Sequence, residues 1–141
     1  MKLIIAGSRN FSNYEFLEKE TIQFIKELVA KFRIQKEDLE IVSGTANGAD
    51  RLGEQFAEKF KLKIHRYPAC WDDWKDKPLH EIKVNQYGKR YWSKAGLYRN
   101  AQMAKNSSAL LAFWDMSSPG TEHMIREAKK HGLEVKVVRY D

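Results

Sequence analysis

The sequence predicts an α/β protein with a doubly wound, mainly parallel sheet of five strands and helices on both faces. Two observations lead to this prediction. Short apolar runs alternate along the chain with segments whose apolar residues recur at helical spacing. Such alternation is typical of a parallel sheet that helices cover on both sides. The length of 141 residues and the hydrophobic fraction of 43% fit one globular domain over residues 1–141.

The strands are expected where apolar runs stop at a turn residue. Lys2 to Ala6 is an Ile-rich run that stops at Gly7, and a second run covers residues 39–42. The other strands are expected over residues 63–66, 109–113 and 135–138. The helices are expected over residues 14–31, 49–60, 97–105 and 121–131, with Asn13 as a cap of the first and Gly132 as the stop of the last. Residues 67–96 are expected to form an irregular, aromatic and basic insertion.

The net charge of +6 is concentrated in one segment. Residues 75–105 hold eight lysines and arginines but only two acids, Asp76 and Glu81, and the rest of the chain is balanced. Such a segment attracts phosphates, either on a small ligand or on a nucleic-acid backbone, although a solvated loop with ordinary lysines has the same composition.

Two features point to a cytoplasmic protein. The single Cys70 excludes an internal disulfide and favours a reducing compartment. The apolar run at the start of the chain is too short for a signal-peptide core or a membrane span, and no membrane partner is expected.

Three strand-to-helix turns combine glycine with small hydroxyl residues, at positions 6–11, 43–50 and 117–121. Glycine lets a backbone approach a ligand closely, and the unpaired N–H groups at a helix start favour a phosphate. In a parallel sheet such turns converge at the carboxyl ends of the strands, where ligands bind. None of the three is a Walker loop or a Gly-x-Gly-x-x-Gly fingerprint, so the pattern predicts a phosphate site of another kind.

Several motifs carry a resemblance to a known family. They are Ala6-Gly7-Ser8-Arg9, Ser43-Gly44-Thr45-Ala46-Asn47-Gly48-Ala49-Asp50, Ala69-Cys70-Trp71, Ala95-Gly96-Leu97-Tyr98-Arg99-Asn100, and Ala112-Phe113 followed by Gly120-Thr121. Over nearly its whole length the chain resembles the SLOG superfamily, which includes DNA-processing protein A and the LOG phosphoribohydrolases. It is most similar to the short YspA-like branch, common in bacteria and phages. The resemblance implies a Rossmann-like sheet and a pocket for a nucleotide or a nucleotide-derived ligand.

The turns and the resemblance together give the candidate ligand-binding residues. These are Gly7, Ser8, Arg9, Phe11, Ser43, Gly44, Thr45, Asn47, Gly48, Asp50, Arg99, Asn100, Trp114, Ser118, Gly120, Thr121 and Glu122. Arg9 and Arg99 are suited to bidentate contacts with phosphate. Asp50 is suited either to capping its helix or to accepting from a ribose hydroxyl. Phe11 and Trp114 are suited to stacking on a base, although aromatic residues more often serve packing.

One position departs from the pattern of the resembling hydrolases. Their motif Pro-Gly-Gly-x-Gly-Thr-x-x-Glu ends in a catalytic glutamate, and Met124 stands at that place here. A thioether cannot accept a proton, and Glu122, the remaining weak catalytic candidate, is rotated from that position by roughly 200° along a helix. Binding without turnover is therefore expected. No cofactor or metal is indicated, because the four histidines lack ligand spacing and Cys70 is alone.

Three functions stay open. The first is binding of a nucleotide-derived, phosphate-bearing small molecule, such as an ADP-ribose derivative or a cyclic nucleotide signal, to sense or sequester it. The second is a LOG-like hydrolysis of a nucleotide N-glycosidic bond, which the loss of the glutamate disfavours. The third is a DNA-processing-protein-A-like binding of single-stranded nucleic acid through residues 75–105. A homo-oligomer is also expected, because aromatic residues as dense as those of the insertion usually meet a partner.

Overall fold

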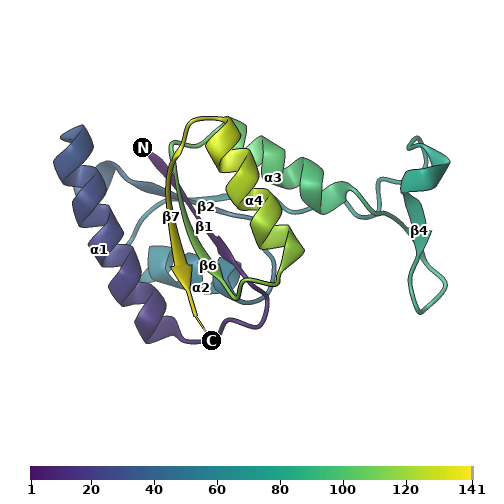
Figure 1. Cartoon of the computed structure of the whole chain (residues 1–141), viewed down its shortest axis with the longest axis horizontal. Helices are drawn as coiled ribbons and strands as arrows, with labels where there is room; N and C mark the ends of the chain where they lie inside the picture. The colour runs from purple at the N-terminus through teal and green to yellow at the C-terminus, as the bar shows by residue number, and fades with distance from the viewer. Residues whose placement is uncertain (141) are drawn as a thin grey trace.

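A computed structural model describes residues 1–140, and its central layer is a five-stranded sheet (Figure 1). The strands are β1 (Lys2–Gly7), β2 (Glu40–Ser43), β3 (Ile64–Arg66), β6 (Ala109–Trp114) and β7 (Glu134–Arg139). They lie in the order β3-β2-β1-β6-β7, and every neighbouring pair is parallel. The predicted Rossmann-like sheet is thus confirmed. Because the chain winds outward from β1 in one direction and returns to add β6 on its other side, the strand order reverses between β1 and β6.

Helices cover both faces of this sheet, as the pattern predicts. On one face lie α1 (Tyr14–Phe32) and α2 (Ala49–Lys59), and on the other lie α3 (Ala95–Lys105) and α4 (Pro119–Lys130). The strand residues alternate between the two layers, since successive side chains of a strand point to opposite faces. In β1, Leu3 and Ile5 pack toward α1 and α2, whereas Ile4 and Ala6 pack toward α3 and α4.

The element boundaries differ from the predicted ones by one or two residues. Asn13 caps α1 as expected, its side-chain oxygen accepting from the N–H of Phe16 at 3.1 Å. Both α3 and α4 begin two residues earlier than predicted, at Ala95 and Pro119. Proline is well suited to that first helical position, because the N–H that it lacks would have no partner there.

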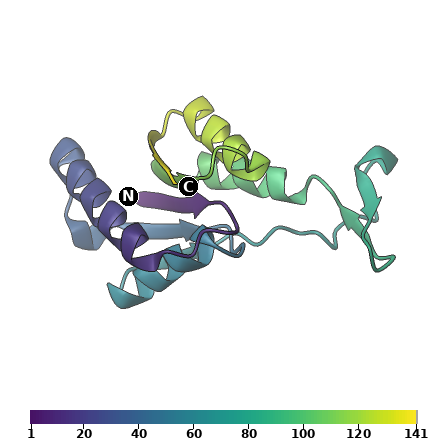
Figure 2. The same cartoon turned by 60° about the horizontal axis from the view of Figure 1, so that its bottom comes forward.

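The insertion that was expected to be irregular over residues 67–96 is not irregular throughout, so that prediction was wrong in part: α3 already begins at Ala95, and residues 68–94 contain regular structure of their own. This segment holds a two-stranded antiparallel ribbon of β4 (Ile82–Val84) and β5 (Arg90–Trp92), preceded by a 3-10 turn at Leu79–Glu81. Asn85 makes the hairpin turn, because its side-chain oxygen accepts from the N–H groups of Tyr87 and Lys89. Figures 1 and 2 both show this segment reaching away from the sheet, and we call it the arm.

The arm is held together by aromatic and cationic side chains rather than by an apolar core. Lys77 lies over the ring of Trp92 at 4.2 Å and Arg90 over the ring of Trp74 at 5.2 Å. The indole N–H of Trp92 donates to Glu81 at 3.0 Å. In the part of the chain that the structure describes, no helix combines the length and the apolar character that crossing a membrane requires.

Candidate phosphate site

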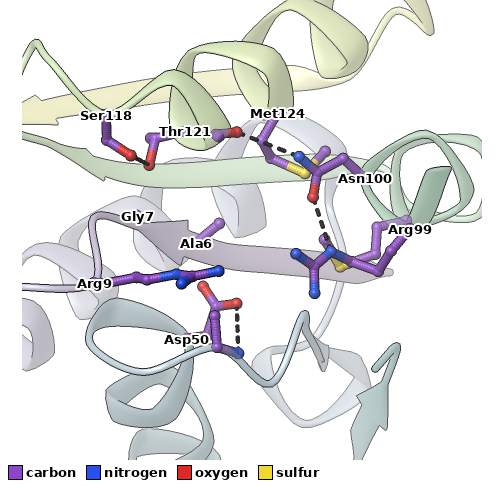
Figure 3. Close-up of a pocket in the computed structure, with 12 residues that line it drawn as sticks. Ala6, Gly7, Arg9, Asp50, Arg99, Asn100, Ser118, Thr121 and Met124 are labelled. Carbon is purple, nitrogen blue, oxygen red and sulfur yellow. Dashed lines mark hydrogen bonds between the residues drawn. The ribbon is translucent and has the colours of Figure 1, made fainter. Parts of the chain in front are cut away.

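The carboxyl ends of β1, β2 and β6 surround one pocket (Figure 3). It lies where the strand order reverses, the usual ligand position in an open parallel sheet. Its volume is about 450 Å³, including space that is open to solvent. The lining residues are Ala6, Gly7, Arg9, Ala46, Asp50, Arg99, Asn100, Met103, Ser118, Gly120, Thr121 and Met124. A shallower hollow next to it shares Arg9, Ser118 and Gly120 and continues over Ser8, Asn10, Asp115 and Pro119.

Two arginines give the pocket its charge. The Nη1 group of Arg99 donates to the carbonyl oxygens of Gly44 and Tyr67, and its Nε donates to Oδ1 of Asn100 at 3.0 Å. Arg9 is exposed and has no hydrogen bond or ion pair to any other residue within 1–140. Burial lowers the pKa of Arg99, and the nearby charge of Arg9 lowers this pKa further while Asp50 opposes the shift. Two guanidinium groups that repel each other favour an anion between them.

Asp50 is the carboxylate that faces these arginines. Figure 3 shows Arg9 and Arg99 reaching toward it from opposite sides. The residue is 5% exposed, and Oδ2 accepts from the N–H of Ala46 at 3.2 Å. The capping interpretation was therefore wrong in detail, because Asp50 lies inside the first turn of α2 and holds the preceding turn. Burial raises the pKa of Asp50 to about 6, against the opposing effects of the Ala46 N–H and Arg99.

The start of α4 supplies the third side of the pocket. Its N-cap residue, Ser118, makes no side-chain cap bond, so the first-turn N–H groups at Gly120 and Thr121 lack an intrahelical acceptor. The turn before the helix is tied in place by Asp115, whose Oδ1 accepts from the N–H groups of Ser117 and Ser118. A helix start held in this way favours a phosphate through its N–H groups and its dipole.

The glycines of the three turns serve different neighbours. A Cβ on Gly7 would lie 2.3 Å from the carbonyl oxygen of Phe113, and one on Gly48 would lie 2.4 Å from that of Ser8. Gly48 also has a φ of +82°, in the left-handed region. These two glycines therefore allow turns of the protein to pack on one another. A Cβ on Gly120 would meet nothing within 4 Å, whereas one on Gly44 would lie 2.8 Å from Oδ2 of Asp50.

Several sequence candidates do not line either hollow. Phe11 is 4% exposed and stacks on Phe113 with 4.9 Å between ring centroids, so the stacking prediction was wrong for it. The indole N–H of Trp114 donates to the carbonyl oxygen of Ser118 at 3.1 Å, which makes Trp114 a brace for the third turn. The remaining residues outside both linings are Ser43, Gly44, Thr45, Asn47, Gly48 and Glu122.

The physical reasons for these positions differ. The hydroxyl of the buried Ser43 donates to Glu54 at 2.6 Å and accepts from the N–H of Thr45. Ser43 and Thr45 therefore stabilise the second turn and do not line the pocket. Asn47 is exposed at the tip of that turn. Glu122 is exposed on α4, whereas Met124 lines the pocket. The weak catalytic candidate thus does not line the site.

The candidate list missed Ala6, Ala46, Met103 and Met124 in the lining, although the sequence had singled out Met124 as the residue in place of a catalytic glutamate. Met103 follows Arg99 by four residues on α3, a spacing that places both on one helix face and so was a usable signal. Ala6 and Ala46 lie within the turns already singled out, but an alanine carries no chemical signal of its own.

Comparison with known proteins identifies a relative and a structural neighbour. No protein-family model matches the chain. The chain is 33% identical over 103 residues to the Gene 61 protein of Mycobacterium phage D29, and the match covers 69% of each protein. Among solved structures it is similar to DNA processing protein A from Helicobacter pylori, whose description concerns a single-stranded DNA binding mode.

That structural likeness has a TM-score of 0.61 at 20% sequence identity and covers 100% of this chain but 66% of the other. It supports the fold and extends over slightly less than two thirds of that protein. A sequence identity of 33% over 69% of both proteins shows that the two belong to one family. The chain belongs to the family of the Gene 61 protein of Mycobacterium phage D29.

Proposed function

We propose that this protein binds single-stranded nucleic acid and holds a backbone phosphate in the pocket between Arg9 and Arg99. The observation that carries this proposal is the convergence of two guanidinium groups and the start of α4 on one small pocket. Arginine forks and helix-start N–H groups are the protein groups that best recognise a phosphate.

Two features favour a strand over a small molecule. The shallower hollow leads on from the pocket past Arg9 and Gly120, so a chain has a path beyond the bound phosphate. The arm adds basic groups and exposed aromatic residues, among them Lys83, Lys89 and the 79% exposed Tyr87. Basic side chains interleaved with aromatic rings are typical of single-strand binding surfaces. The likeness to a protein described for its single-stranded DNA binding mode is in line with this.

The test is binding of a fluorescent oligothymidine of about 20 nucleotides, followed by anisotropy over a series of salt concentrations. Arg99→Ala is expected to weaken binding by about 1.5–3 kcal/mol, the range for hydrogen bonds to a charged group. The double variant Lys83→Ala/Lys89→Ala is expected to reduce the salt slope by about 1.4, since each phosphate contact on a single strand contributes about 0.7. Lys130→Ala, at the opposite end of α4 from the pocket, is the matched control. Unchanged binding in both test variants would refute the proposal.

A second candidate is a free nucleotide-derived molecule, which the buried carboxylate of Asp50 favours. Asp50 is positioned at the pocket to accept from a sugar hydroxyl, and the 2′-hydroxyl is absent from DNA. Competition separates the two. Displacement of the oligothymidine by an ADP-ribose derivative or a cyclic nucleotide at micromolar concentration would favour the small molecule, whereas displacement by unlabelled strands alone would favour nucleic acid.

A further inference from the structure

A chain of polar contacts leads from the pocket to side chains of α4 that do not line it. The amide Nδ2 of Asn100 donates to the carbonyl oxygen of Gly120 at 3.3 Å and lies 3.2 Å from Nδ1 of His123. The other ring nitrogen of His123, Nε2, lies 3.4 Å from Oε1 of Glu127. The side chains of His123 and Glu127 are 18% and 17% exposed, so both are largely shielded from water.

The donors and acceptors in this chain fix one another. The Nε of Arg99 can only donate, so the Asn100 atom that faces it is the oxygen. The carbonyl of Gly120 can only accept, so the atom that faces it is the amide nitrogen. His123 must then accept through Nδ1, and its single proton lies on Nε2, toward the carboxylate of Glu127. The amide of Asn100 thus has a partner on both its oxygen and its nitrogen.

The surroundings of His123 favour its neutral ring. Burial lowers the pKa of His123, the charge of Glu127 on the same helix opposes this, and Arg126 lowers the pKa further. From α3, the ring faces Asn100, and through that amide Arg99. His131 lies beyond Glu127, its Nδ1 3.8 Å from Oε2 of that carboxylate. A protonated ring would carry a donor at Nδ1 and would oppose the Asn100 amide.

We propose that His123 is a positioning residue of the phosphate pocket: its Nδ1, oriented by Glu127, fixes the amide of Asn100 and thereby the guanidinium of Arg99. Without that acceptor, the amide nitrogen of Asn100 keeps only the carbonyl oxygen of Gly120 as its partner, at 3.3 Å. The amide is then held less firmly, and so is the Nε of Arg99, which donates to it, while the bonds of Arg99 to the carbonyl oxygens of Gly44 and Tyr67 remain. The inference rests on the proposed function in one respect, that Arg99 holds a phosphate.

The test uses two variants of nearly equal shape, His123→Leu and His123→Asn. Leucine removes the acceptor, whereas asparagine places a carbonyl oxygen close to the position of Nδ1. Affinity for the oligothymidine is expected to fall about 2- to 10-fold in His123→Leu, the equivalent of one hydrogen bond, and to return to within about twofold of the unsubstituted protein in His123→Asn. Equal losses in both variants, or no loss in His123→Leu, would overturn the proposal.

A second measurement does not depend on any ligand. In ¹⁵N NMR spectra of the unbound protein, the Nε–H signal of Arg99 is expected to be sharp and slowly exchanging in the unsubstituted protein and in His123→Asn. In His123→Leu it is expected to broaden and to exchange faster with water. If no form of the protein binds the oligothymidine, the proposed function fails, and these spectra still decide whether His123 positions Arg99.

Discussion

Replacing Asp50 by asparagine is expected to flatten the pH dependence of stability between about pH 4 and pH 6. The carboxyl group has a pKa of about 6 in the folded protein, against 3.8 ordinarily. Between these values the folded protein holds a proton on Asp50 that the unfolded chain has lost. The free energy of unfolding therefore falls as the pH rises through this window and stays lower above it.

The magnitude follows from the size of the shift. The difference of roughly 2 pKa units corresponds to about 3 kcal/mol, at 1.36 kcal/mol for each unit. Because Asp50 is only 5% exposed, there is little solvent screening to reduce this figure. Above about pH 7 the ionised carboxylate thus lowers the stability of the protein by about 3 kcal/mol.

Urea unfolding at several pH values measures this cost directly. Subtracting the profile of Asp50→Asn from that of the unsubstituted protein cancels the other titrating groups and isolates Asp50. The difference should change by about 3 kcal/mol between pH 4 and pH 8. Glu54→Gln is the control, because Glu54 is a buried carboxyl group on the same helix whose pKa is lowered. When its profile is subtracted from that of the unsubstituted protein, the difference in the free energy of unfolding should change with pH in the opposite direction. Parallel profiles for Asp50→Asn and the unsubstituted protein would refute the reasoning.

The same titration extends to ligand binding. An anion placed beside Asp50 favours the protonated carboxyl, so affinity for oligothymidine should rise as the pH falls through about 6. Phosphodiesters do not titrate in this range, so the strand keeps its charge. Asp50→Asn should bind with an affinity that stays constant over the window, and a persistent rise in that variant would assign the effect to another group.

Three further outcomes are expected. Gly7→Ala should destabilise the fold by several kcal/mol in thermal unfolding, because its Cβ would meet the Phe113 carbonyl, while Gly120→Ala should keep the melting temperature and weaken oligothymidine binding. After incubation with nucleoside monophosphates or ADP-ribose derivatives, chromatography should detect no free base, because Met124 lines the pocket and Glu122 does not. Base release that is abolished by Glu122→Gln would instead show that the protein is an enzyme. Light scattering should report a dimer or larger assembly that depends on the arm, and a monomer at high concentration would contradict this.

The sheet was predictable because its central strands β1, β2 and β6 are short apolar runs that stop before a turn. β1 ends at Gly7 and β2 at Ser43, and these stops also locate the turns that form the pocket. The arm was harder to predict, since its strands have three residues each and show too little alternation. The available signal was the pair Asn85 and Gly88, which flank a tight hairpin turn.

The site was predictable in its charged residues and less so in its apolar ones. Arg99 and Asn100 were found through a motif. The helical spacing of apolar residues predicts α3 itself, but it does not predict that α3 brings these two residues close to the end of β1. Phe11 was misjudged because its partners, Phe113 and Tyr140, are more than 100 residues away in the chain and cannot be inferred from local spacing. A ring that follows a glycine turn looks the same in sequence whether it stacks on a base or on another phenylalanine.

The contacts of Gly7 and Gly48 bear on how the family diverges. Each of these glycines faces a carbonyl oxygen of the protein itself, so selection for folding alone retains them whatever the ligand. Gly120 is under no such constraint, and under the proposed function its identity is free to change with the ligand. Among relatives of this chain, the first two glycines should therefore record shared ancestry, and variation at position 120 should mark the lineages that changed what they bind.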